Sequence, residues 1–237
     1  MKRFPPTLLT GLVLGAAGVL AAQERYEVAG QRVAIYNLAG EVSVEAGQGR
    51  SVSVEVRRGG SDAGDLTVAR GAIGDRETLR VIYPADAIHY PSRGDGYGTD
   101  VYVRPDGTFG DGGRDRGHRS DRRVRISGRR GDFEAWADLT IRVPEGQRIE
   151  VYLGAGRLVA SNVRGNVHLD GASADVSATG ITGPLSVDVG SGDVTVRDIA
   201  GDVDLDTGSG SVDVTGIRGD GLRRGAGFPG PDAAARA

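Results

Sequence analysis

Cysteine is absent from this 237-residue chain, and lysine occurs once, at Lys2. The absence of cysteine excludes disulfides and thiolate chemistry, so the stability of the fold must come from packing. Aromatic residues make up only 5% of the chain, whereas glycine occurs 40 times. This composition favours one elongated domain with a thin core, or two small domains, over a large sphere.

An apolar run long enough to span a bilayer is also lacking at the N-terminus. The stretch from Leu8 to Leu20 has thirteen residues, about 20 Å as a helix against a hydrocarbon core of about 30 Å. It follows the positive charges of Lys2 and Arg3 and ends in small residues near Ala21. This pattern predicts a cleavable signal peptide over residues 1–21 rather than a membrane anchor. We therefore expect an exported chain, periplasmic, extracellular or on the cell surface, with no transmembrane segment after cleavage.

The charge balance gives no support for nucleic-acid binding. The formal net charge is -3, and removal of Lys2 and Arg3 makes it -5. A nucleic-acid binder would present a clearly basic face, which an acidic chain of this kind does not predict.

The C-terminal half repeats with a period of 18 residues. Glycine recurs at this step, and apolar residues keep the same step in four columns, of which one is Ile149, Val167, Leu185 and Val203. Within each unit, apolar and polar residues alternate with period two, and glycine-rich turns separate two short strands. Units of this kind bury their apolar faces by stacking on one another.

The chain is therefore predicted to be all-β, with residues 149–219 forming a parallel β-solenoid of 18-residue units, similar to a β-helix. An antiparallel meander or sandwich is the alternative. Segments 32–36, 41–45 and 51–56 alternate in the same way and are interpreted as earlier, less regular units. Further strands are expected at 79–83 and 133–143.

Two segments are predicted to lack regular structure. Residues 91–132 contain ten Gly, ten Arg and seven acidic residues with almost no apolar periodicity, so burial cannot offset the entropy of ordering them. Residues 221–237 have the same character. The expected organisation is a signal peptide (1–21), one β domain (22–220) with a mobile insertion (91–132), and a disordered tail (221–237).

Three stretches resemble a known family. "YNLAGEVSVEAG", "LTIRVPEGQRIEVYLGAG" and "GSGDVTVRDIAGDVDLDTGSGSVDVTGIRGD" are similar to the bacterial putative-adhesin family, a domain of unknown function in exported and envelope proteins. The resemblance covers most of the chain outside the insertion and the tail. It implies an adhesive role and brings no catalytic residue and no cofactor.

Aspartates form two columns of the repeat that could hold calcium. Clustered oxygen ligands suit Ca²⁺, but stacked carboxylates in water repel by only about 1 kcal/mol before screening. A solvated ladder therefore needs no metal, and the columns are only weak calcium candidates: Asp170, Asp188 and Asp206 in the first, Asp175 and Asp193 in the second.

Catalysis is not expected. Asp202, Asp204 and Asp206 lie along one exposed strand face, whereas a glycosidase needs a carboxylic acid of raised pKa in a desolvated cleft. The three histidines are too scattered to suggest a zinc site. A carbohydrate-active enzyme on a β-helix scaffold remains a third reading.

Arginines of the insertion are the candidates for contacting an anionic polymer, since guanidinium groups pair bidentately with phosphate and carboxylate. A solvated, charged loop is the alternative. Trp136 could stack on a sugar or pack beneath the insertion. The possible polymer contacts are Arg114, Arg116, Arg119, Arg122, Arg123, Arg125, Arg129, Arg130 and Trp136.

The sequence thus favours a non-catalytic exported β-solenoid that needs no cofactor and acts as an adhesin or envelope surface-binding module. Its partner would be an anionic envelope polymer, a polysaccharide or an envelope protein. The main alternative is a regulatory or sensing partner in an envelope-stress system. The oligomeric state stays open.

Overall fold

The computed structural model describes residues 24–93, 98–110, 120–129, 133–219 and 221–224. In this part the chain is all-β, as predicted, and no helix in it is long and apolar enough to cross a membrane. Several predictions fall outside the described residues: the signal peptide, the tail beyond residue 224, Arg114, Arg116, Arg119 and Arg130.

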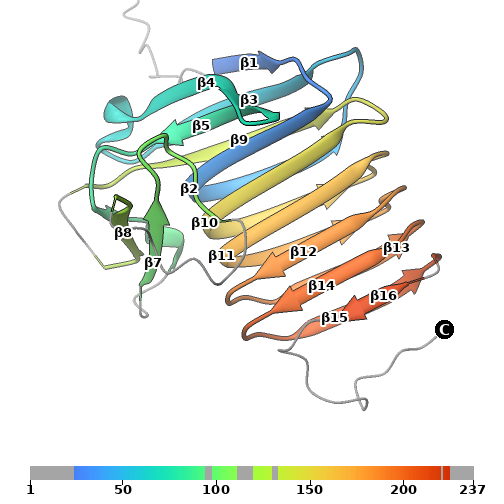
Figure 1. Ribbon diagram of the computed structural model, residues 1–237. Coiled ribbons are helices and arrows are strands. Elements are labelled where there is room, and N and C mark those ends of the chain that lie inside the picture. Colours follow the sequence, from blue (N-terminus) through green and yellow to red (C-terminus); the bar gives the residue numbers. More distant parts are fainter. Residues whose placement is uncertain (1–23, 94–97, 111–119, 130–132, 220, 225–237) are drawn as a thin grey trace, which may run out of the picture.

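A stack of parallel strands forms the body of the molecule (Figure 1). Its members are β2 (Arg32–Ala46), β10 (Arg148–Ser161), β11 (Asn166–Thr179), β12 (Leu185–Val189), β13 (Val194–Ile199), β14 (Val203–Thr207), β15 (Val212–Ile217) and β16 (Leu222–Arg224). β10 pairs along its length with β2 on one side and β11 on the other. β11 continues through its first half to β12, β14 and β16, and through its second half to β13 and β15.

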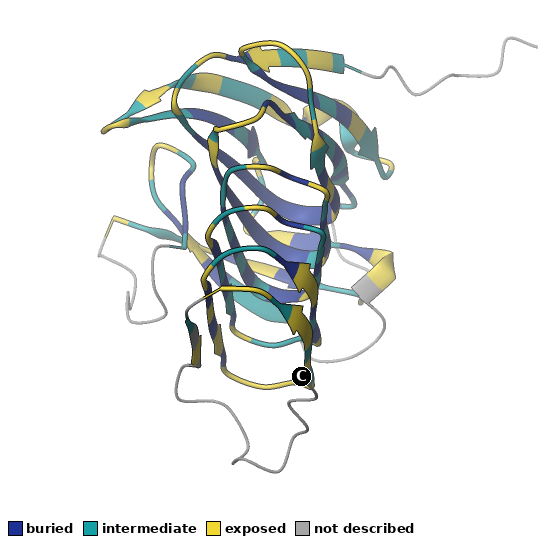
Figure 2. Ribbon diagram, turned by 90° about the vertical axis from the view of Figure 1, so that its right-hand side faces the viewer, coloured by how far each residue is buried: buried dark blue, intermediate teal, exposed yellow. Residues whose placement is uncertain are grey.

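The step of the sequence repeat is the register of this pairing. Ile149 lies opposite Val167, and Val167 lies opposite Leu185, each eighteen positions further along the chain. Valine and isoleucine suit such columns because branched side chains pack well on a pleated surface. The inner columns are at most 2% exposed: Ile149, Val151, Val167, Leu169, Leu185, Val187, Val203 and Leu205. Figure 2 shows the successive loops one below another, with buried residues on the inward strands.

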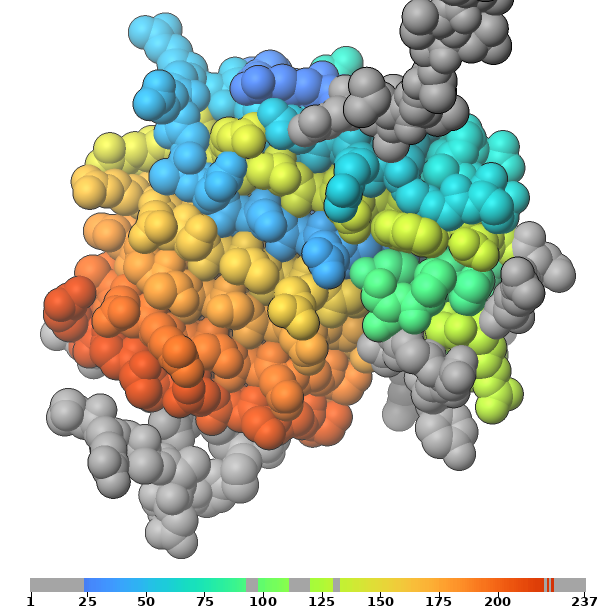
Figure 3. All heavy atoms as spheres, turned by 180° about the vertical axis from the view of Figure 1, so that it is seen from behind, coloured from blue at the N-terminus to red at the C-terminus, as the bar shows by residue number. Residues whose placement is uncertain are grey.

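β2 extends the columns upstream. Val33 pairs with Ile149, and Val42 with Leu158, so the predicted segments 32–36 and 41–45 are one strand in register with the repeat. Figure 3 shows the consequence, since the blue band of β2 lies against the gold band of β10 although the two are far apart in sequence.

The N-terminal end of the stack is covered by antiparallel strands. β5 (Arg76–Ile82) and β9 (Trp136–Val143) pair in parallel with β2. Each of them has an antiparallel neighbour on its other side, β4 (Thr67–Ile73) on β5 and β3 (Val52–Gly59) on β9. β1 (Glu24–Val28) then pairs antiparallel with β3. The prediction that residues 51–56 form an earlier repeat unit is therefore wrong. Alternation with period two indicates a half-buried strand but does not fix the direction of its pairing.

The predicted mobile insertion contains ordered strands. β7 (Thr99–Val103) and β8 (Arg122–Ser127) form a second sheet with β6 (Ala87–His89), which lies just before the insertion. A short 3₁₀ turn at Pro91–Arg93 lies between β6 and β7. Val101, Val103, Val124 and Ile126 are buried, at 0–6% exposure. The prediction of a segment without structure is thus wrong for residues 99–103 and 122–127. These runs of alternating residues are short, and the many glycines and arginines around them hid the alternation in the sequence.

This second sheet is anchored on the outer face of the stack. Phe109 meets the ring of Tyr36 edge to face at 5.7 Å, and Tyr36 stacks on Tyr152 at 4.5 Å.

The prediction that residues 221–237 lack regular structure is also wrong at its start, because the backbone of Leu222–Arg224 forms β16.

Glycine occupies most of the corners where a strand turns from one side of the stack to the next, at Gly40, Gly156, Gly192 and Gly210, whereas β11 has Ala174 at this position. At Gly156 an added Cβ would lie 1.9 Å from the carbonyl oxygen of Gly40, and the φ angle is +137°. At Gly192 the corresponding distance to the oxygen of Ala174 is 2.1 Å, with φ +141°. These corners therefore need glycine both for the backbone angle and for the close approach of the neighbouring strand.

We predict that Gly156→Ala lowers the free energy of unfolding by at least about 2 kcal/mol, since strain and overlap act together. Two controls separate these effects in urea titrations. Gly49 has φ +94° and nothing within 4 Å of an added Cβ, so Gly49→Ala reports strain alone. Gly64 has open space and no such angle, so Gly64→Ala should be nearly neutral. Equal stability of the Gly156 and Gly64 variants would contradict the prediction.

A buried carboxylate joins the first two strands of the stack. Glu150 is 1% exposed and accepts hydrogen bonds from Arg32 Nε at 2.6 Å, Arg76 Nη1 at 3.0 Å and Arg148 Nε at 3.0 Å. Burial acts to raise the pKa of Glu150, but the hydrogen bonds from Arg32 and Arg76 outweigh it and hold the pKa below the usual value of 4.5. The cluster is therefore charged at neutral pH.

Glu150 should make stability depend on pH. A folded-state pKa below the unfolded value gives a contribution that is present above about pH 4.5 and lost as the pH falls through the folded-state value. Glu150→Gln should cost about 2–3 kcal/mol at pH 7 and show a smaller loss of stability on acidification than the parent chain. Urea titrations at pH 7 and pH 3 measure both. Identical pH slopes for the two chains would remove this role.

Candidate functional site

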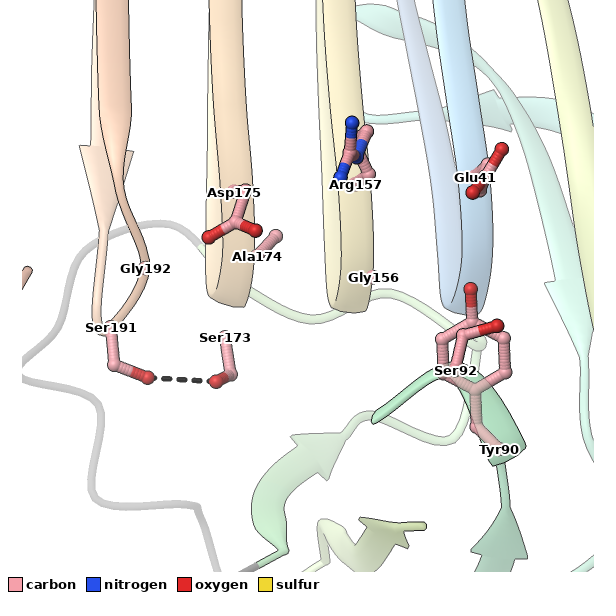
Figure 4. A pocket seen from close by; sticks show the side chains of 10 residues that line it. All are labelled: Glu41, Tyr90, Ser92, Gly156, Arg157, Ser173, Ala174, Asp175, Ser191 and Gly192. Atoms are coloured by element: carbon pink, nitrogen blue, oxygen red, sulfur yellow. Dashed lines mark hydrogen bonds between the residues drawn. The ribbon is translucent and has the colours of Figure 1, made fainter. Parts of the chain in front are cut away.

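A polar groove lies at the corner of the stack, where the segment between β6 and β7 meets β2, β10 and β11 (Figure 4). Its volume is about 290 Å³. Its floor follows the glycine corner, which keeps the backbone accessible. We call it the Arg157 groove; its lining residues are Glu41, Tyr90, Ser92, Gly156, Arg157, Ser173, Ala174, Asp175, Ser191 and Gly192.

Register places one arginine between two carboxylates. Arg157 pairs with Glu41 on β2 and with Asp175 on β11, so the three side chains leave neighbouring strands about 4.8 Å apart. All three are exposed. Within the described residues Arg157 makes no hydrogen bond or ion pair, which leaves its guanidinium donors available to a ligand.

Hydroxyl groups line the rest of the groove. Ser173 and Ser191 occupy one column and share a hydrogen bond of 2.7 Å between their Oγ atoms. The ring of Tyr90 is buried, and its hydroxyl points toward the strand of Glu41 (Figure 4). Burial raises the pKa of Tyr90, although a hydrogen bond with Ser92 acts in the opposite direction. The phenol is therefore protonated at neutral pH and able to donate.

The first predicted aspartate column is assembled as expected but is not arranged around a metal. Asp170, Asp188 and Asp206 are register neighbours. Burial, followed by the negative charge of Asp206, raises the pKa of Asp188, which is the direction that uncompensated neighbouring carboxylates produce. Within the described ranges no three His, Asp or Glu side chains converge as metal ligands.

The second aspartate column holds successive units together. Asp175 Oδ1 accepts the backbone N–H of Asp193 at 3.0 Å, and Asp193 Oδ1 accepts the backbone N–H of Ser211 at 2.8 Å. Each carboxylate thus satisfies a turn donor one unit further along, which accounts for its recurrence without a metal.

The described arginines of the predicted polymer contact are largely paired within the chain. Arg122 contacts Asp86 at 2.9 Å, Arg123 contacts Asp100 at 2.7 Å, and Arg125 lies 3.5 Å from the same Asp100. Arg129 is exposed. Aspartates therefore offset much of the positive charge of β8.

Trp136 packs into the molecule. The ring is half-buried, lies against Gly59, where an added Cβ would come within 2.4 Å of it, and is 6.0 Å from the ring of Tyr90. Of the two sequence interpretations, packing beneath the segment that leads into the insertion fits this geometry.

The residues of the Arg157 groove were missed in the sequence, apart from Asp175. One signal was present: "LAGEVSV" and "GAGRLVA" align on their glycines and place Glu41 and Arg157 in one column. Tyr90 and Ser92 carry no such signal, because their position depends on a long-range fold.

No protein-family model and no curated protein matches this chain. One solved structure, a crystal structure of a putative cell adhesion protein from Clostridium sporogenes, aligns with 81% of this chain and 98% of its own, at 8% identity and a TM-score of 0.43. A likeness this distant carries no argument about function, which has to be argued from the site.

We predict that calcium leaves the melting temperature unchanged to within about 1 °C relative to a chelator. A specific ion at a hundred times its Kd would stabilise the fold by about 2.7 kcal/mol, which corresponds to several degrees for a chain of this size. Differential scanning fluorimetry in millimolar calcium, millimolar magnesium and EDTA provides the measurement. A rise with calcium alone that Asp188→Asn abolishes would restore the calcium hypothesis.

Proposed function

We propose that this chain is an exported, non-catalytic β-solenoid that binds a polymer of the cell envelope or the extracellular surroundings, in the manner of an adhesin. The parallel pairing at a constant 18-residue step supports the solenoid, and the apolar stretch behind Lys2 and Arg3 supports export.

The observation that carries the proposal is the arrangement around Arg157. The guanidinium of Arg157, which has no partner among the described residues, lies between the register partners Glu41 and Asp175, with the hydroxyls of Tyr90, Ser92 and Ser173 around it. Guanidinium and hydroxyl groups donate hydrogen bonds, while carboxylates and hydroxyls accept them. A molecule that displays many hydroxyls or carbonyls finds both kinds of partner within one groove.

The ordered insertion supports binding rather than turnover. Tyr90 and Ser92, directly after β6, supply one wall of the groove, whereas the stack supplies the other, and β6 is paired with β8 of the insertion. Rigid elements hold a recognition surface with little entropy to lose on binding. The groove is open to solvent, which suits a polymer chain that enters from the side.

The test is co-sedimentation of residues 22–237 with isolated cell envelopes. We expect Arg157→Ala to weaken binding about tenfold, the loss of one to two charge-assisted hydrogen bonds. Arg164→Ala is the matched control, because Arg164 is also exposed, at 68% of its side chain, and does not line the groove. Point variants are used because deletion of residues 91–132 would remove Phe109 from its contact with Tyr36.

Four outcomes are informative. Failure of the parent chain to sediment would overturn the proposal, and so would equal losses in the Arg157 and Arg164 variants. Capture of a single protein at fixed stoichiometry, in place of the envelope polymer, would favour the regulatory alternative. Release of sugar by the parent chain would indicate an enzyme.

A further inference from the structure

A second groove lies on the other side of the same corner. Its volume is about 270 Å³, and β7 and the segment after it form one wall. The opposite wall is formed by β11 around Gly171 and by the turn after β12 around Gly190. We call it the Tyr102 groove. The side chains that matter below are Asp100, Tyr102, Asp170, Ala172 and Asp188.

The two grooves are adjacent because they share the corner. Ala172 lines the Tyr102 groove and Ser173 lines the Arg157 groove; in the next unit, Gly190 and Ser191 divide in the same way. Consecutive Cα atoms are about 3.8 Å apart. The dividing residues are glycine, alanine and serine, so no large side chain of this wall separates one groove from the other.

Tyr102 gives the second groove a flat apolar surface. Among the described residues it is the large hydrophobic side chain left exposed, at 45%. It lies opposite Arg123 on the neighbouring strand, and β7 and β8 hold it in place. An exposed aromatic ring with one polar end suits a ligand that is apolar on one face and polar at its edges, as a sugar ring is.

The charges of the Tyr102 groove select against anions. Asp170, Asp188 and Asp121 line it together with the guanidinium of Arg104. Asp100 also lines it, but its charge is paired with Arg123 at 2.7 Å. Arg104 donates hydrogen bonds to Thr108 Oγ1 and to the carbonyl oxygen of Gly110, each at 3.2 Å. Carboxylates accept hydrogen bonds from sugar hydroxyls, but they repel phosphate and uronate groups.

Size indicates that neither groove holds a chain alone. Ligand pockets commonly measure about 300–1,000 Å³, and each groove lies just below this range. A short oligomer that passes over the shared corner would occupy both.

We propose that the Arg157 groove and the Tyr102 groove are adjacent subsites for one uncharged polysaccharide, with the ring of Tyr102 as the stacking surface of the second subsite. This inference rests on the proposed function and names its ligand class. It replaces the anionic polymer expected from the arginines of the insertion by an uncharged one.

Isothermal titration with oligosaccharide series of one to six residues tests the proposal. The uncharged probes are maltose-series, cellulose-series and N-acetylglucosamine-series oligomers; the charged ones are glucosamine and galacturonate oligomers. We expect at least one uncharged series to bind, with an affinity that rises about tenfold once the oligomer is long enough to reach both grooves and that changes little with salt. Binding of no uncharged series, or tighter binding of the galacturonate series, would overturn the proposal.

Substitutions separate the two subsites. Tyr102→Ala should remove the gain in affinity with length, about tenfold, while short oligomers bind as in the parent chain. Tyr102→Phe keeps the ring and should retain the gain. Since Tyr102 is exposed, both variants should melt with the parent chain. An undiminished gain in Tyr102→Ala would overturn the second subsite.

The envelope assay then separates this inference from the proposed function. Sedimentation that depends on Arg157 but not on Tyr102 would keep the envelope-binding role and remove the second subsite. Absence of sedimentation together with a length-dependent gain lost in Tyr102→Ala would keep the saccharide subsites and remove the envelope as their source.

Discussion

The close approach of parallel backbones at the corner is the constraint on which the rest of this molecule depends. Strands that turn a corner while staying about 4.8 Å from their neighbours leave no space for Cβ at Gly156 or Gly192. Once the corners of neighbouring strands are aligned, the apolar columns on either side of the corner are in register as well. The same corner forms the floor of the Arg157 groove, so stacking and recognition have one geometric origin.

Charge performs two different tasks in this chain. At Glu150 it is buried and shared among three arginines, which ties the repeat to β2 and to the strands that cover the N-terminal end. At Arg157 it is exposed and has no partner among the described residues. Both positions belong to β10, and they differ because Arg32, Arg76 and Arg148 enclose Glu150, whereas Arg157 lies at the exposed corner.

Prediction from sequence succeeded where contacts recur at a fixed step. The column from Ile149 to Val203 was visible because every unit repeats the same requirement, and its register followed directly. It failed at β3, where alternation does not encode direction, and at Val101 and Val124, whose short runs were hidden by polar neighbours. Tyr90 reaches the groove through one long-range contact, and a contact made once leaves no period in a sequence.

The repeat also allows the length of the stack to change without a change in the Arg157 groove. Each unit contacts mainly the one before and the one after it, so an additional 18 residues between β13 and β14 would lengthen the body by about 4.8 Å without moving Glu41, Arg157 or Asp175. Among the described residues, the last strands of the stack have Val212 and Val214 half-buried. A lineage could therefore change the reach of such a protein by duplication while its recognition surface stayed the same.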